Sequence, residues 1–267
     1  METWLPGVRM LNDLSWDLTD TAVLEVQCRQ RRYVVKAGSP SDHHIEREIA
    51  AHQSAVHVLA RQNRAPRLIR SDLLLNILVT EYLGGSLVEG SEAEYATAIY
   101  VQAGSLLRAF HDQAARTDQD FEAAATAKAL AWLYGPHRIE ESAAEQAAAI
   151  LGAYEPEPVT VVPTHGDWQP RNWLISGSEL RVIDFGRYEF RPAASDFCRL
   201  AVQQWRAVPR LETAFFAGYG SDPRDTKLWN VMQLREAVST AAWAYRVGDH
   251  KFEEQGHRML RDALGDF

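Results

Sequence analysis

The chain carries two short polar segments, HGDWQPRN at residues 165–172 and VIDFG at residues 182–186. Each follows an apolar, β-type run and contains the Gly or Pro that is typical of a loop. Asp167 offers a carboxylate to a hydroxyl group, and Asn172 offers an amide oxygen to a metal. Asp184 adds a hard anionic oxygen of the kind that Mg²⁺ prefers. Together they supply what phosphoryl transfer asks of a protein: a group that orients the hydroxyl and ligands for the metal.

The N-terminal half adds a lysine and a glutamate in a compatible order. Lys36 ends the strand-like run YVVK at residues 33–36, and Glu48 lies on the helix that is predicted to follow. A lysine held by a helix glutamate can be directed at the α- and β-phosphates of a nucleotide. Glu46, on the same predicted helix, is a rival partner for the lysine. All these motifs in this order are much harder to attribute to chance than any one of them.

Hydrophobic patterning divides the chain into a smaller β-rich half and a larger helical half, with a hinge near Gly84. The first half is predicted to contain strands at 22–28, 32–36, 67–70 and 76–82 and a helix over 45–62. In the second half, Ser91 and Glu94 form a capping box that predicts a helix start. Further helices are expected across 121–153, with a break at Gly135-Pro136, at 195–204 and twice between 226 and 264. Short strands are expected between 159 and 185.

The His-Gly-Asp form of the first segment, with Asp-Phe-Gly downstream, resembles the aminoglycoside phosphotransferases, a branch of the protein-kinase-like fold that includes related small-molecule kinases. The resemblance covers roughly residues 17–200. It implies an α+β, bilobal fold with an N-terminal antiparallel five-stranded sheet and one long helix, followed by a larger, mainly helical lobe. Residues 1–83 would form the nucleotide-binding lobe and residues 84–267 the catalytic and substrate-binding lobe.

The resemblance also implies a role for each residue that matches the family's motifs. Asp167 is expected to be the catalytic base, with Asn172 and Asp184 as the Mg²⁺ ligands. The expected nucleotide contacts are Lys36, held by Glu48, and the backbone groups of Thr80 and Tyr82, which precede Gly84-Gly85 and would meet the adenine. Arg187 is expected to line the substrate site, and Asp196 to be a buried aspartate that braces the catalytic loop. The nucleotide is expected to be ATP, with GTP left open.

Three departures from protein kinases argue against a protein substrate or leave a question open. The turn that would cover the phosphates, residues 17–21, contains no glycine. Gln169 stands where protein kinases usually place a lysine, two residues after the base. No Ala-Pro-Glu follows Asp184. The first departure leaves open how tightly the phosphates are covered, and the other two disfavour a protein kinase.

Composition narrows the classes of partner. The 267 residues are 46% hydrophobic and 24% charged, as in ordinary globular proteins. The formal net charge of −8 disfavours a nucleic-acid binder and is compatible with a cationic substrate. Several late acidic residues are candidate sites for substrate ammonium groups: Glu236, Glu253, Glu254 and Asp266. Two isolated cysteines, no secretory signal and no membrane-length apolar run predict a cytoplasmic protein without a membrane partner.

The sequence therefore predicts an ATP- and Mg²⁺-dependent O-phosphotransferase that acts on a hydroxyl of a small molecule. The expected acceptor is an aminoglycoside-like or other amino-alcohol antibiotic, which would imply antibiotic resistance. The alternatives are a metabolic kinase for choline, homoserine or a sugar, a protein kinase, and a catalytically silent nucleotide-binding regulator. The pattern leaves the oligomeric state open.

Overall fold

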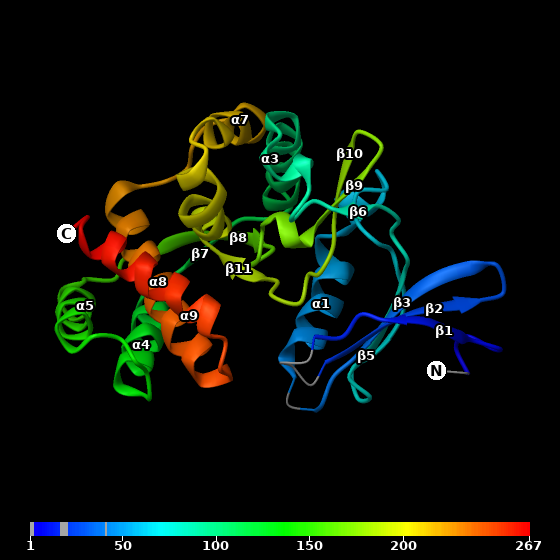
Figure 1. The fold of residues 1–267 in the computed structure, drawn as a ribbon, viewed down its shortest axis with the longest axis horizontal. Helices are drawn as coiled ribbons and strands as arrows, with labels where there is room; N and C mark the ends of the chain where they lie inside the picture. The colour runs from blue at the N-terminus through cyan, green and yellow to red at the C-terminus, as the bar shows by residue number, and fades with distance from the viewer. Residues whose placement is uncertain (1–2, 17–20, 41) are drawn as a thin grey trace.

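The computed structural model describes residues 3–16, 21–40 and 42–267, and its N-terminal part is an antiparallel five-stranded sheet (Figure 1). The strands follow the order β1-β2-β3-β5-β4. Their bounds are β1 Arg9–Asp13, β2 Ala22–Cys28, β3 Arg31–Ala37, β4 Leu68–Asp72 and β5 Ile77–Glu81. The predicted fold class is confirmed. The glycine-free turn at 17–21 lies, apart from Thr21, outside the described residues.

The helix that follows the sheet's third strand is shorter than predicted. α1 (His43–Ser54) packs Ile45 and Ile49 against Leu78 of the sheet. It ends at Ser54, and the one-turn helix α2 (His57–Ala60) follows. The hydroxyl of Ser54 donates to a carbonyl one turn earlier, a local bond that often bends helices. Residues of α2 join the apolar core of the C-terminal part.

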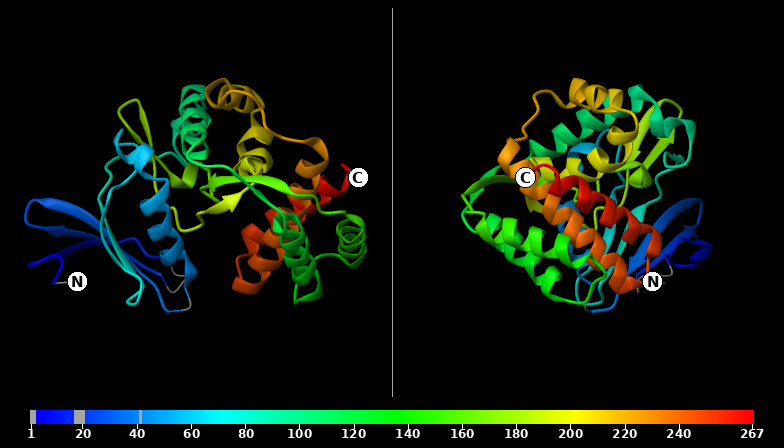
Figure 2. Two further views of the ribbon diagram at one scale, coloured as in Figure 1. Left: turned by 180° about the vertical axis from the view of Figure 1, so that it is seen from behind. Right: turned by 60° about the vertical axis from the view of Figure 1, so that its left-hand side comes forward.

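The C-terminal part is mainly helical and surrounds two small sheets. Figure 1 places β7, β8 and β11 between the pair α3 and α7 and the group α4, α5, α8 and α9, and it places β6, β9 and β10 on the side of α3 that faces the N-terminal sheet. Figure 2 shows the same fold from two other sides. The helices are α3 Thr97–His111, α4 Phe121–Tyr134, α5 Glu141–Ala153, α6 Cys198–Leu200, α7 Arg210–Tyr219, α8 Thr226–Val247 and α9 His250–Leu264. The strands are β6 Ser86–Leu87, β7 Arg116–Asp118, β8 Val159–Thr164, β9 Trp173–Ser176, β10 Glu179–Val182 and β11 Glu189–Arg191. The predicted capping box starts a short 3₁₀ turn at Glu92–Tyr95 rather than α3 itself.

Two strand pairings hold the two polar loops side by side. The first loop runs from Thr164 at the end of β8 to Trp173 at the start of β9, and the second runs from Val182 to Glu189. Thr164 pairs with Glu189, and Trp173 pairs with Val182, both in antiparallel register. Each loop is therefore anchored to the other at both ends. Beneath them, the fully buried Phe185 is one of the aromatic side chains in the apolar core.

In the part of the chain that the structure describes, no helix is both long and apolar enough to cross a bilayer. The helices instead bury one another's apolar faces. α3 and α7 approach each other closely, and two glycines there face the opposing backbone. A Cβ on Gly104 would overlap the carbonyl oxygen of Phe215, and one on Gly218 would overlap that of Val101.

We expect Gly218→Ala to destabilise the protein by about 1–3 kcal/mol, because a methyl group forces two packed helix backbones apart. Gly152→Ala is the matched control, since Gly152 lies on α5 with open space around its Cβ position. That control should gain up to about 1 kcal/mol from helix propensity. Urea unfolding of both variants measures the two changes, and equal effects would show that α3 and α7 have room to separate.

Candidate active site

Lys36 of β3 connects the N-terminal sheet to the second polar loop. Its Nζ lies 2.6 Å from Oε2 of Glu48 on α1 and 2.7 Å from Oδ1 of Asp184. Burial opposes the charged ammonium, but the carboxylates of Asp184 and Glu48 outweigh burial and raise the pKa of Lys36. The rival glutamate, Glu46, is exposed and lies 3.6 Å from His43 instead. Of the two, Glu48 is therefore the one that holds the lysine.

Asp184 combines an exposed carboxylate with a strained backbone. Its side chain is 50% exposed, and its φ of 66° lies in the left-handed region that residues other than glycine rarely adopt. The Lys36 ammonium lowers the pKa of Asp184 to about 2. The carboxylate is therefore ionised at neutral pH. Strain of this kind is often concentrated at functional sites, where the surrounding structure fixes a side chain's direction.

Asp167 is almost fully buried and accepts hydrogen bonds from several cationic and amide groups. Its carboxylate lies 2.5 Å from Nη2 of Arg171, 3.1 Å from Nε of Arg199 and 2.8 Å from Nδ2 of Asn172. Gln169 donates a further bond of 2.5 Å. Burial alone would raise the pKa of Asp167, but the guanidinium groups of Arg199 and Arg171 outweigh it and hold the pKa well below its usual range.

The first loop has the shape needed to present this carboxylate. Gly166 adopts a φ of 77°, and a Cβ there would overlap the carbonyl oxygen of Arg187. The loop's backbone is fixed by Asp196, whose carboxylate accepts from the N–H groups of His165 at 2.8 Å and Gly166 at 2.6 Å. Asp196 is buried and also lies 3.0 Å from His111. These contacts agree with the bracing role that the resemblance implies for this aspartate.

A magnesium ion fits the donor set of the two loops. The amide nitrogen of Asn172 donates to the backbone carbonyl and to the carboxylate of Asp167. The Oδ1 of Asn172 accepts no bond from the described residues. The N–H of Ile183 donates to the backbone carbonyl of Asn172 at 3.0 Å, and this bond keeps Asn172 beside Asp184. Within the described ranges no group of three or more His, Cys, Asp or Glu side chains is arranged so that it could hold a metal ion. Mg²⁺ needs none, because it usually takes one or two protein oxygens and completes its shell with phosphates and water.

Thr80 and Tyr82, the expected adenine contacts, lie in and next to the N-terminal sheet and not at the two polar loops. Thr80 lies within β5 and is buried, with β3 on one side and β4 on the other. The N–H of Tyr82 donates to the carbonyl of Arg32 at 3.1 Å, and the Arg32 guanidinium lies 3.7 Å from the Tyr82 ring centre. The Tyr82 carbonyl accepts no backbone bond from any described residue. That carbonyl is the group left at Tyr82 for an adenine amine.

A cavity of about 480 Å³ lies beside Asp167, and Lys36, Asn172 and Asp184 do not line it. Its walls come from α1, α4, α8, α9 and the two polar loops, and they include Asp167 and Arg187 but not Lys36, Thr80 or Tyr82. Burial, followed by the nearby Arg199, lowers the pKa of Arg187. The structure thus brings Lys36, Glu48, Asp184, Asn172 and Asp167 together. It sets Arg187 in the cavity and leaves the expected adenine contacts at the sheet.

Sequence reasoning missed two residues of this cluster. Arg199 on α6 bridges Asp167 and Glu236 of α8, at 3.1 Å from each. No motif marks Arg199, and Glu236 was considered only as a site for a substrate ammonium. Arg171 lies inside the first motif, so its position beside Asp167 was the one available signal.

A family model described as the phosphotransferase enzyme family matches residues 13–229. A comparison with curated proteins finds no match. Among solved structures, a thermostable mutant of the aminoglycoside phosphotransferase APH(4)-Ia, with ADP and hygromycin B, matches with a TM-score of 0.74 at 14% identity, covering 99% of this chain and 96% of that chain. Choline kinase LicA from Streptococcus pneumoniae gives 0.68 at 15%, covering 98% and 94%. Spectinomycin phosphotransferase APH(9)-Ia, with ADP and spectinomycin, gives 0.64 at 11%, covering 97% and 93%. At such identities these structures support the fold alone.

We expect Asp167→Asn to lower stability at pH 7 by on the order of 3 kcal/mol, because it removes the buried carboxylate that lies between the guanidinium groups of Arg171 and Arg199. Since the folded pKa of Asp167 is depressed, its contribution is complete above the unfolded value of about 3.9 and is lost as the pH falls below it. The gap between wild type and variant should therefore narrow by about 1 kcal/mol at pH 3.

Urea unfolding at the two pH values measures this gap. Asp266→Asn serves as the control, because this carboxylate lies exposed near the chain end and its loss should change stability by less than about 0.5 kcal/mol. A gap for Asp167→Asn that is unchanged or wider at pH 3 would contradict the depressed pKa.

Proposed function

The chain belongs to the phosphotransferase enzyme family and is a small-molecule phosphotransferase that acts on a hydroxyl group, and from this premise we propose that it uses Mg²⁺ and ATP. The observation that carries the proposal is the contact of Lys36 with both Glu48 and Asp184, beside the Asp167–Asn172 pair. The solved complexes with ADP support a nucleotide in this fold. GTP in place of ATP remains an alternative of the same chemistry.

In the proposed mechanism Lys36 holds the α- and β-phosphates, and Glu48 keeps the ammonium directed at them. Asn172 and Asp184 would hold Mg²⁺, which offsets negative charge on the phosphates. Asp167 accepts a hydrogen bond from the acceptor hydroxyl and aligns its oxygen with the γ-phosphorus. That oxygen forms the new P–O bond while the bond to the β-phosphate oxygen breaks, and ADP leaves with the electron pair.

The depressed pKa of Asp167 defines how it acts. A carboxylate surrounded by arginines is a weak base, so it draws little of the hydroxyl proton before the new bond forms. We propose that Asp167 acts mainly by orientation, and that the proton passes to its carboxylate late, when the acceptor oxygen becomes acidic on binding phosphorus, and from there to water. Positioning of this kind supplies most of the acceleration in phosphoryl transfer.

The lobes at residues 1–83 and 84–267 are proposed to divide the work between nucleotide and acceptor. The cavity beside Asp167 qualifies this division, because His44 and Arg47 of α1 contribute to its wall. The acceptor would therefore touch both lobes. The names of the similar structures mention hygromycin B, spectinomycin and choline, which differ in size and charge. An amino-alcohol antibiotic, with a role in resistance, and a metabolic alcohol are both candidate acceptors on fold grounds.

We expect Glu48→Gln to weaken the binding of Mg²⁺·ATP about tenfold, because the lysine loses the charge that directs it. Glu46→Gln is the matched control: it lies on the same helix, makes the same chemical change and leaves Lys36 untouched. Isothermal titration with a non-hydrolysable ATP analogue measures both affinities. Equal affinities for the two variants would show that Lys36 does not contact the phosphates.

We expect Asp167→Ala to reduce turnover by at least about 100-fold while the affinity for nucleotide changes little. Asp184→Ala should instead abolish the dependence of nucleotide binding on Mg²⁺. The measurement is ADP release from ATP with a panel of aminoglycosides, amino alcohols, sugars and hydroxy acids, with nucleotide titrations alongside. If Asp167→Ala turned over at the wild-type rate, Asp167 would not be the group that orients the hydroxyl.

A further inference from the structure

The charges of the cavity beside Asp167 point to one class of acceptor. Resting on the proposed function, we infer that the acceptor is a hydroxyl compound that carries an anionic group, a carboxylate or a phosphate ester, and that this group binds to Arg187, Arg47 and Lys128. A polycationic aminoglycoside would then be a poor fit.

The cavity is basic although the whole chain is acidic. Six cationic side chains and four carboxylates line it, an excess of two positive charges, whereas the chain has a formal net charge of −8. The cations are Arg47, Lys128, Arg187, Arg191, Arg199 and Arg235, and the carboxylates are Asp167, Glu189, Asp196 and Glu236. Clefts that carry one sign of charge concentrate ligands of the other sign. This cavity therefore favours an anion.

Every carboxylate in the cavity wall already has a partner from the protein. Asp167 is held by Arg171 and Arg199, and Glu236 by Arg199. The carboxylate of Glu189 lies 2.7 Å from Arg191. The remaining carboxylate, Asp196, accepts from the backbone of the first loop. An ammonium group entering the cavity would have to compete with a guanidinium or with these backbone bonds for each carboxylate.

Three of the cations, by contrast, have charge to spare. The side chains of Arg47 on α1, Lys128 on α4 and Arg187 in the second loop make no hydrogen bond or ion pair with any residue that the structure describes. Arg187 is partly buried, and although the carboxylates of Asp167 and Glu236 attract its guanidinium without touching it, no hydrogen bond from a described residue replaces the hydration that this group loses. A bound carboxylate or phosphate would offset that loss, and it matches the planar donor fork of arginine.

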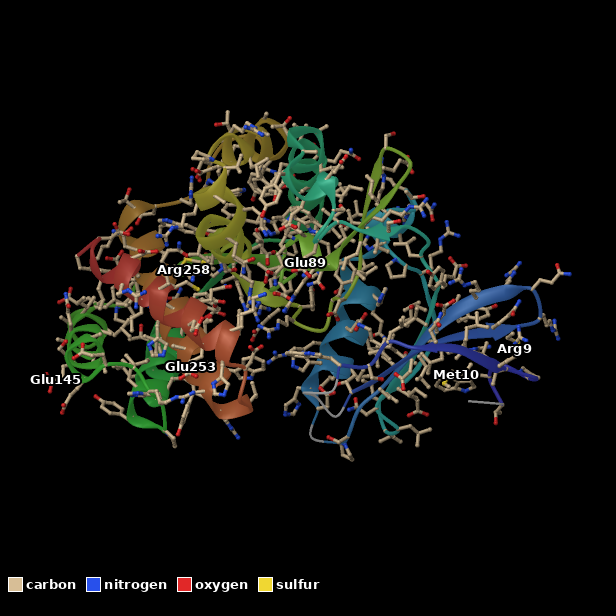
Figure 3. The ribbon with its side chains drawn as sticks, viewed as in Figure 1. Arg9, Met10, Glu89, Glu145, Glu253 and Arg258 are labelled. Atoms are coloured by element: carbon tan, nitrogen blue, oxygen red, sulfur yellow. The ribbon has the colours of Figure 1, made fainter. Side chains whose placement is uncertain are left out.

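Three of the four acidic residues that the sequence offered for a cationic substrate lie outside the cavity. Figure 3 labels Glu253 on α9, where it is buried and held by Arg138 at 2.5 Å. Glu254 and Asp266 are exposed and do not line the cavity. Of the acidic residues that the sequence offered for a cationic substrate, only Glu236 reaches the cavity, and Arg199 occupies it.

A second reading of the free cations is that they bind the nucleotide's phosphates, and the position of α4 argues against it for Lys128. Figures 1 and 2 show α4 far from the N-terminal sheet that carries Lys36. Lys128 lies on this distant helix and lines the cavity. A cation there faces the acceptor's side of Asp167. Lys128 is therefore the residue whose loss separates acceptor recognition from nucleotide binding.

The test uses three probes with one polyol skeleton: D-gluconate, which is anionic, D-sorbitol, which is neutral, and D-glucamine, which is cationic. Each is titrated calorimetrically into the protein saturated with Mg²⁺ and a non-hydrolysable ATP analogue, so that the phosphate site is filled. We expect gluconate to bind at least about tenfold more tightly than sorbitol, and glucamine more weakly than either. Gluconate that binds no more tightly than sorbitol, or not at all at millimolar concentration, overturns the inference. So does a preference for glucamine.

The variants test which residues make the preference. Lys128→Gln, at an exposed helix position, should reduce gluconate affinity several-fold and leave the nucleotide affinity unchanged, and Arg187→Gln should reduce it about tenfold. Arg258→Gln, an exposed change on α9 outside the cavity wall, is the control and should change neither affinity. If Lys128→Gln and Arg258→Gln behave alike, the anion binds elsewhere and the inference fails.

The same titrations without nucleotide distinguish this inference from the proposed function. If the protein prefers gluconate but does not bind the Mg²⁺·ATP analogue, the anion site is supported and the proposed use of Mg²⁺ and ATP is wrong. A protein that binds the nucleotide but shows no charge preference would keep the proposed function and lose the anionic acceptor.

Discussion

The ion pair between Lys36 and Asp184 joins residues 148 positions apart, and the arrangement of the site depends on it. It ties the N-terminal sheet to the second polar loop at the point where that loop's backbone is strained. Removing two charges from water is expensive, and their attraction repays this only with good geometry. Here Glu48 adds a second carboxylate to the lysine, and the half-exposed Asp184 keeps part of its hydration. The attraction therefore offsets the cost of desolvation even without a ligand, and the contact positions Lys36 and Asp184 to bind one.

The carboxylate of Asp167 is organised by a different balance. Arg171 and Arg199 keep it ionised, and Glu236 shares Arg199 from the far side. The alternating chain of charges from Arg171 to Glu236 holds the carboxylate in place from several directions. It also weakens the carboxylate as a base, since a nearby guanidinium stabilises the ionised form. The arginines therefore make the Asp167 carboxylate a weaker base but hold it in a fixed direction. This suits a reaction whose barrier is lowered mainly by alignment of the reacting groups.

Local patterns in the sequence predicted a β-rich half, a helical half and a lysine followed by a helix that carries Glu48 and its rival Glu46. The kinase-like fold class came from the resemblance of two short motifs to a known family. The end of α1 at Ser54 was not predictable, because the apolar periodicity continues through α2 while the core it joins is formed by distant helices. Arg199 was missed for a similar reason. Its role arises only when α6 lies beside the first loop, and nothing in its sequence neighbourhood records that contact.

The net charge of the chain and the charge of the cavity beside Asp167 have opposite signs for a physical reason. The charge of the whole chain governs solubility and long-range fields, whereas a bound group responds to the few charges within several ångströms, which solvent screens least. Around Asp167 the carboxylates are neutralised in pairs, and the unpaired groups are cations on three separate elements. What a cavity attracts is decided by the charges left over after the protein's own pairing. For this chain those charges are positive, although the sum over the sequence is negative.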